Sequence, residues 1–154
     1  KGPTTKGYST MTLLTLDQAN IIADKALEKA QSLGFHPQTV AILDAGGHIK
    51  VIKRSDGASL MRPEIAYGKA WGVLGMGFGG RDLARRAEKA PAFFTALNAV
   101  SNGRMVPVAG GVLIKDADGE IIGSVGISGD DSDNDEICAV AGIVAAGLIP
   151  DTGA

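Results

Sequence analysis

The chain has 154 residues, of which 45% are hydrophobic and 21% charged, and its formal net charge is -2. These values predict one globular domain with a sizeable core. They argue against a nucleic-acid-binding or membrane-surface protein, and no apolar run reaches the ~18–20 residues that span a bilayer.

Glycine and cysteine depart from average usage. The 22 glycines are dispersed along the chain, which favours tight turns and close backbone contacts. The single cysteine, Cys138, excludes an internal disulfide and a cysteine-based zinc site, and its apolar surroundings predict a buried residue. We interpret residues 1–10 as a tag remnant or a short extension and residues 11–154 as one domain.

In chain order, the first predicted element is a helix over residues 16–33. Thr15 and Gln18 form a capping-box pattern before it, apolar residues recur at helical spacing, and Gly34 can end it. Two runs typical of strands follow, TVAILD and HIKVIKR. The Ala45-Gly46-Gly47 stretch between them predicts a hairpin.

A second helix is predicted to begin near Pro63 and to carry EIAYGKAWGVLG. Tyr67, Trp71 and Leu74 share one of its faces. Each glycine in such a helix costs about 1 kcal/mol relative to alanine. We therefore expect something to pack very close to it, either a partner subunit or a flat ligand.

The second half begins with two short helices, RDLARRAEK and PAFFTALNAV, broken at Pro91. Three predicted strands follow, RMVPV, GGVLIKD and EIIGSVGIS, and Asp116-Ala117-Asp118-Gly119 predicts a hairpin between the last two. A final helix over residues 133–147 can be capped by Ser132. The order predicts an α/β fold of the α+β kind, an antiparallel sheet flanked by helices.

Two motifs match known sites only formally. GMGFGG at 75–80 satisfies G-x-G-x-x-G, but a helix precedes it where a dinucleotide site needs a strand. Asp131, Asp133 and Asp135 have the spacing of a calcium loop but lack its glycine and glutamate. We interpret these acidic residues as charges that stabilise the start of the last helix.

The remaining candidates are side chains that could bind a ligand. His48 follows the hairpin turn, and His36 lies before Pro37. A haem site needs an axial donor, apolar walls and cations near the propionates. Further residues could serve those purposes: Glu64, Tyr67, Lys69, Arg104, Met61, Met76 and Met105.

Four separated stretches resemble one family: DAGGHIKVIKRSDGA, EIAYGKAW, PVAGGVLIKDADGEIIGSVGISG and SDNDEICAVAG. They are similar to the GlcG/HbpS family, also called the haem-degrading or DUF336 domain, which includes the C-terminal domain of some corrinoid adenosyltransferases. The resemblance covers about residues 12–148. The residues that match the family pattern are Glu64, Ala66, Lys69, Ala70, Gly110, Gly111, Gly126 and Gly129.

The resemblance implies an antiparallel α/β domain that forms homo-oligomers, from dimers up to octamers. It implies haem as a cofactor in several members, with a role in haem handling, breakdown or redox sensing. We predict His48 as the metal ligand, with Glu64, Tyr67, Lys69 and Arg104 around a small-molecule ligand. We expect a cytoplasmic protein, or a secreted one if a signal peptide has been removed.

Two alternatives stay open at this point. In the first, the protein is an enzyme that acts on a small organic acid: Lys69 and Arg104 hold a carboxylate, and Asp44, Glu64 or His48 moves a proton. In the second, the protein is an oligomeric scaffold, and its glycine-rich helix only packs subunits together.

Overall fold

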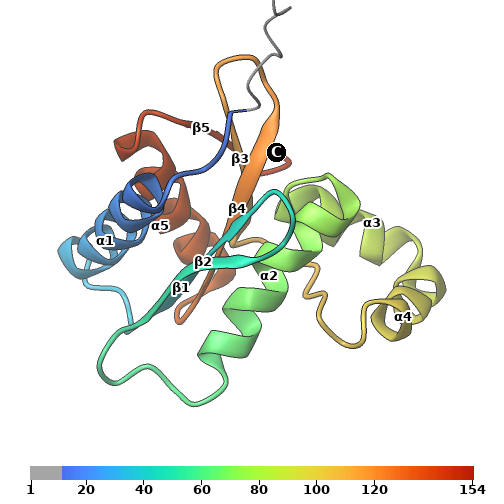
Figure 1. Cartoon of the computed structure of the whole chain (residues 1–154). Coiled ribbons are helices and arrows are strands. Elements are labelled where there is room, and N and C mark those ends of the chain that lie inside the picture. Colours follow the sequence, from blue (N-terminus) through green and yellow to red (C-terminus); the bar gives the residue numbers. More distant parts are fainter. Residues whose placement is uncertain (1–11) are drawn as a thin grey trace, which may run out of the picture.

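The computed structural model describes residues 12–154, and these fold around a five-stranded antiparallel sheet with strand order β2-β1-β4-β3-β5. Helices cover both faces of the sheet (Figure 1). The elements are α1 (Leu16–Ser32), β1 (Thr39–Asp44), β2 (Ile49–Arg54), α2 (Arg62–Met76), α3 (Gly80–Lys89), α4 (Pro91–Val100), β3 (Gly111–Lys115), β4 (Ile121–Ser128), α5 (Ser132–Ala145) and β5 (Ile149–Asp151).

The larger apolar core lies between the sheet and the paired helices α1 and α5 (Figure 1). Alternate residues of the central strands, such as Val40 and Ile42 in β1, point into it and are fully buried. Ile22 of α1 and Ile143 of α5 fill the helical side. The predicted capping box is present at the start of α1, where the Thr15 and Gln18 side chains each accept a backbone N–H of the other residue.

Helix α2 covers the other face of the sheet, and α3 and α4 lie beyond it (Figure 1). A smaller core joins these elements around Val73, Leu83, Phe94 and Leu113. Where α2 crosses β4, a side chain on Gly126 would collide with the backbone of Ala66. The Ser124 hydroxyl donates to the Ala70 carbonyl oxygen at 2.7 Å. Small residues on both elements therefore bring helix and strand into close contact.

Most predicted elements are confirmed, but one strand was predicted wrongly and another was missed. RMVPV is not a strand: it is a connector along α2, and its Val106 amide donates to the Gly68 carbonyl oxygen rather than to a strand. The short strand β5 was missed because it has three residues, one of them proline, and pairs only with the edge of β3. The last helix begins at Ser132, and no side chain caps it.

At two glycines of α2, Gly68 and Gly72, the close contact that we expected from a partner subunit or a flat ligand comes from the chain itself. A side chain on Gly68 would collide with Val106 and the Arg104 carbonyl, and one on Gly72 would collide with Met105. The connector after α4 thus occupies the space that these glycines leave.

Two further expectations concern residues 1–10 and membrane crossing. The predicted extension over residues 1–10 lies outside the described residues. Within residues 12–154, no helix combines the length and the apolar character that a membrane crossing requires.

Candidate functional site

The sequence-predicted site residues meet in part at an open cleft of about 360 Å³ between β2 and α2. Glu64 and Tyr67 project from the first turns of α2, and Arg104 comes from the connector after α4. Ile52 on the edge strand β2 forms the opposite wall. Pro63 and Gly103 complete the lining.

Helical spacing and stacking position the polar groups of this cleft. Tyr67 lies one turn after Glu64, and Trp71 lies one turn after Tyr67, so all three share a face of α2. The Arg104 guanidinium stacks on the Trp71 ring, with its carbon 4.1 Å from the ring centroid, and its Nε donates to the Ser101 carbonyl oxygen. Stacking of this kind holds the cation at the mouth of the cleft.

Several polar groups in the cleft are available to a ligand. Tyr67 is half-buried, and neither its hydroxyl nor the Glu64 carboxylate has a hydrogen-bond partner among the described residues. The terminal nitrogens of Arg104 likewise donate to no described residue. The cleft therefore combines apolar walls with one cation, one carboxylate and one phenol.

His48 lies outside the cleft, at the exposed turn between β1 and β2. Asp44 builds this turn: its Oδ1 accepts the backbone N–H groups of Gly46 and His48, both at 3.0 Å. Gly47 has a φ of +81° and lies near the Trp71 indole. The turn thus requires glycine at position 47 but makes no use of the imidazole.

Lys69 also lies apart from the cleft, because its side chain leaves α2 toward the interior. It is 3% exposed, and its Nζ lies 3.2 Å from Asp135 Oδ2 of α5. A side chain on Gly110 would come within 2.9 Å of this ammonium group, so the glycine leaves space for the lysine. Burial lowers the pKa of Lys69, while the Asp135 carboxylate opposes that shift.

Asp135 lies in the first turn of α5, as predicted, and it is in addition a buried hydrogen-bond hub. Besides Lys69, it accepts the Gln38 side-chain amide at 3.1 Å and the Asp130 backbone N–H at 3.0 Å. Burial raises its pKa, and the nearby Lys69 ammonium opposes this effect. The role of Asp135 is to join α2, α5 and the segment before β1.

The remaining candidates do not converge on a metal centre. Met105 is buried and Met76 half-buried in the smaller core, while Met61 is exposed at the start of α2. His36 is exposed, and its backbone N–H donates to Asp130. Within residues 12–154, no three His, Cys, Asp or Glu side chains are grouped so that they could hold a metal ion.

Sequence reasoning missed two parts of the cleft. The wall residue Ile52 could have been found from strand alternation, because its neighbour Val51 faces the main core. The stacking of Arg104 on Trp71 has no local signal. It depends on where the connector after α4 returns to α2.

Comparison with known proteins places the chain in one family. The family model described as haem degrading protein HbpS-like matches residues 14–144. The corrinoid adenosyltransferase PduO of Salmonella typhimurium strain LT2 is 31% identical over 137 residues, which are 89% of this chain and 40% of that protein. The chain thus spans less than half the length of that relative.

Two solved structures agree in fold over nearly the whole chain. A PduOC:heme complex is 30% identical, with a TM-score of 0.81 over 90% of this chain and 98% of that chain. HbpS is also 30% identical, with a TM-score of 0.77 over 94% of this chain and 97% of that chain. The chain therefore belongs to the family that this model describes, haem degrading protein HbpS-like.

Proposed function

We propose that this protein binds haem, with one part of the macrocycle seated in the cleft between β2 and α2. One observation carries the proposal: Ile52, Pro63, Tyr67 and Arg104, from separate parts of the chain, line one cleft. Membership of the HbpS-like family and the likeness to a PduOC:heme complex support haem as the ligand.

The residues present fit the chemical groups of haem. Ile52 and Pro63 provide apolar contact for the macrocycle, and the free donors of Arg104 suit a propionate. The cleft is too small to enclose the whole macrocycle. A second copy of the chain would cover the rest, in keeping with the homo-oligomer that we predict.

Two side chains are candidates for the iron ligand. Tyr67 lines the cleft and its hydroxyl has no partner among the described residues, and phenolate is a known haem ligand. His48 lies outside the cleft, at the turn beside Trp71. It could therefore bind the iron only if this turn closed over the haem. We propose Tyr67 as the donor and keep His48 as the second candidate.

The geometry supports the hypothesis of an organic-acid enzyme less well than it supports haem binding. Lys69 is buried against Asp135, and the Asp44 carboxylate is occupied by the backbone of its own turn. Of the groups assigned to that reaction, Arg104 and Glu64 remain together in the cleft.

A haemin titration followed by absorbance tests the proposal. We expect a saturable Soret band for the wild type, a shifted or weakened band for Tyr67→Phe, and weaker binding for Arg104→Gln. His48→Ala should leave the band unchanged. Loss of the band in His48→Ala alone would assign the iron to His48 instead.

His36→Ala is the matched control, because His36 is exposed and is not among the residues that line the cleft. Absorbance that never saturates would contradict haem binding. The same sample also shows whether the protein degrades the bound haem or only holds it. Decay of the Soret band after a reductant is added in air would support haem degradation, and a persistent band would support haem handling.

A further inference from the structure

A cavity of about 330 Å³ lies at the start of α2, between the loop that follows β2 and the segment before β1. Its lining consists of His36, Pro37, Gly57, Ser59, Arg62 and Gly129. None of these residues lines the cleft between β2 and α2, so the two are separate. The volume is within the range of sites that hold small organic molecules.

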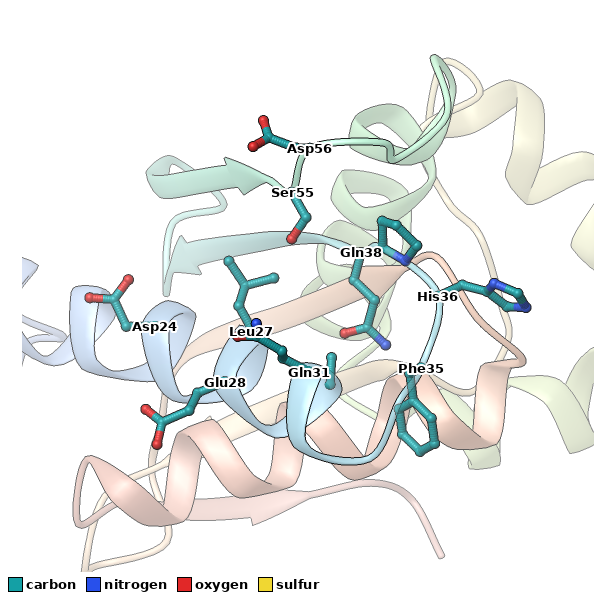
Figure 2. Close-up of a pocket in the computed structure, with 11 residues that line it drawn as sticks. Asp24, Leu27, Glu28, Gln31, Phe35, His36, Gln38, Ser55 and Asp56 are labelled. Carbon is teal, nitrogen blue, oxygen red and sulfur yellow. The ribbon is translucent and has the colours of Figure 1, made fainter.

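The polar groups that line this cavity are a guanidinium, an imidazole and a hydroxyl. His36 and Pro37 also line a larger neighbouring cavity of about 630 Å³ (Figure 2). Three carboxylates line the larger cavity and are absent from the lining of the smaller one: Asp24, Glu28 and Asp56. The smaller cavity is therefore suited to an anion rather than a cation.

Arg62 is a half-buried arginine without a carboxylate partner. Its Nε donates to the Ser59 hydroxyl at 3.1 Å, and its Nη1 donates to the Ser128 hydroxyl at 3.2 Å. Arg62 forms no ion pair with any described residue, whereas Arg81, the other half-buried arginine of residues 12–154, pairs with two carboxylates. Charged groups that lose contact with water are normally paired. The two serines thus fix the guanidinium and leave its Nη2 available to an acceptor.

The surrounding charges favour an anion with a single charge. Lys69 and Asp135 form a buried ion pair, and both burial and the charge of Arg62 lower the pKa of Lys69. The positive charge of Arg62 is therefore not cancelled within the fold. The Asp130 carboxylate lies beside His36, whose backbone N–H it accepts at 2.8 Å. This negative charge would repel a second charge on the ligand.

We propose that this cavity binds a small monocarboxylate through Arg62 and Ser59. Arg62 Nη2 donates to one carboxylate oxygen. The Ser59 hydroxyl accepts from Arg62 Nε and can donate its own hydrogen to the other oxygen. The planar donors of an arginine match the two oxygens of a carboxylate, and Pro37 contacts the apolar part of the ligand. This site does not depend on haem binding.

The test is a titration followed by two-dimensional amide NMR at constant ionic strength, with butyrate as the probe. We expect saturable shifts at the Gly57 and Ser59 backbone amides and at Arg62 Nε–H. Butyramide, which has the same shape without the charge, should bind at least about tenfold more weakly. Equal binding of the two probes would overturn the proposal, as would shifts confined to Tyr67 and Arg104. Tighter binding of butylphosphonate than of butyrate would contradict the choice of a single charge.

Two pairs of variants locate the binding. Arg62→Gln should weaken butyrate binding at least about tenfold, while Arg86→Gln, which removes an exposed arginine of α3, should not change it. Ser59→Asp places a carboxylate beside Arg62 and should abolish binding. Ser59→Asn, of similar shape and without the charge, should bind within about threefold of the wild type. Because Ser59 is exposed, both of its variants should fold. Unchanged binding in Ser59→Asp would contradict the site.

Discussion

At the scale of single residues, Gly126 and Asp130 stabilise the packing of the fold because of where the backbone places them. Gly126 of β4 lets α2 pack against the sheet, and Asp130 joins the loop before α5 to the segment before β1. Neither residue lines the cleft between β2 and α2. Gly126 holds α2, which carries Glu64 and Tyr67, and Asp130 holds two loops outside the cleft, so their substitution tests the frame around the site.

We predict that Gly126→Ala destabilises the protein by about 3 kcal/mol or more, because the added methyl group would meet the α2 backbone, which cannot rotate away. Urea unfolding measures this change. Gly75→Ala is the control, because Gly75 lies on the exposed side of α2, near the movable Trp71 ring. This substitution should change the free energy of unfolding by less than about 1 kcal/mol. Similar values for both variants would contradict the packing argument.

We also predict a pH effect from Asp130. Hydrogen bonds from the His36 backbone, the Asn134 amide and the Asp131 backbone lower its pKa from 3.8 to about 2. The folded state therefore binds this proton less tightly than the unfolded state. The resulting stability is fully present above about pH 4 and is lost as the pH falls toward about 2.

Unfolding by urea at several pH values between 2 and 5 checks this prediction. The wild type should lose stability over that range, and Asp130→Asn should show a flatter profile. Asp131→Asn, an exposed neighbour, should keep the wild-type slope. An Asp130→Asn profile parallel to the wild type would show that other carboxylates dominate acid unfolding.

At the scale of elements, the buried ion pair between Lys69 and Asp135 connects helices that cover opposite faces of the sheet. The lysine reaches α5 by passing Gly110, at the end of the sheet near the start of β3. Gln38 adds the segment before β1 to the same hub. The pair therefore fixes α2, which carries Glu64 and Tyr67, relative to the rest of the domain.

We predict that Lys69→Met destabilises the protein by about 3–5 kcal/mol, because it leaves the Asp135 carboxylate buried without its cation. Adding Asp135→Asn should restore part of that loss, since the amide can still accept hydrogen bonds without a buried charge. Lys25→Met removes an exposed ion pair and should cost under about 1 kcal/mol. A Lys69→Met variant as stable as this control would refute a structural role for the pair.

At the scale of the whole molecule, large apolar side chains are exposed at several places in the described chain. Leu60 is 89% exposed, Val100 77% and Phe93 55%. Single exposed apolar residues are normal on protein surfaces. The expectation of a homo-oligomer therefore rests on the family resemblance, and these residues are candidate contacts in it.

We therefore predict a mass in solution of at least two chains of 15.7 kDa. Light scattering after size exclusion, repeated over a range of protein concentrations, measures it. If haem binds in the cleft between β2 and α2 and a second copy completes that site, haemin should also slow dissociation of the oligomer on dilution. A single-chain mass at all concentrations would contradict the prediction.

Local patterns in the sequence predicted most of the fold. The capping box at Thr15, the glycine turns at Gly47 and Gly119 and the proline at the start of α2 depend on neighbouring residues only, and all are present. The RMVPV segment shows the limit of such patterns. It is apolar like a strand, but its Val106 amide donates to Gly68 of α2, which lies far from it in the sequence.

For the candidate site, the sequence by itself determined which chemical groups are available and that Glu64 and Tyr67 share one face of a helix. Only the tertiary structure decided that Arg104 joins them, that His48 stays outside, and that Lys69 turns inward to Asp135. The physical reason is that helical spacing is fixed by the backbone. The partner of a long charged side chain is set by which segments pack together and which glycines leave room for it to pass.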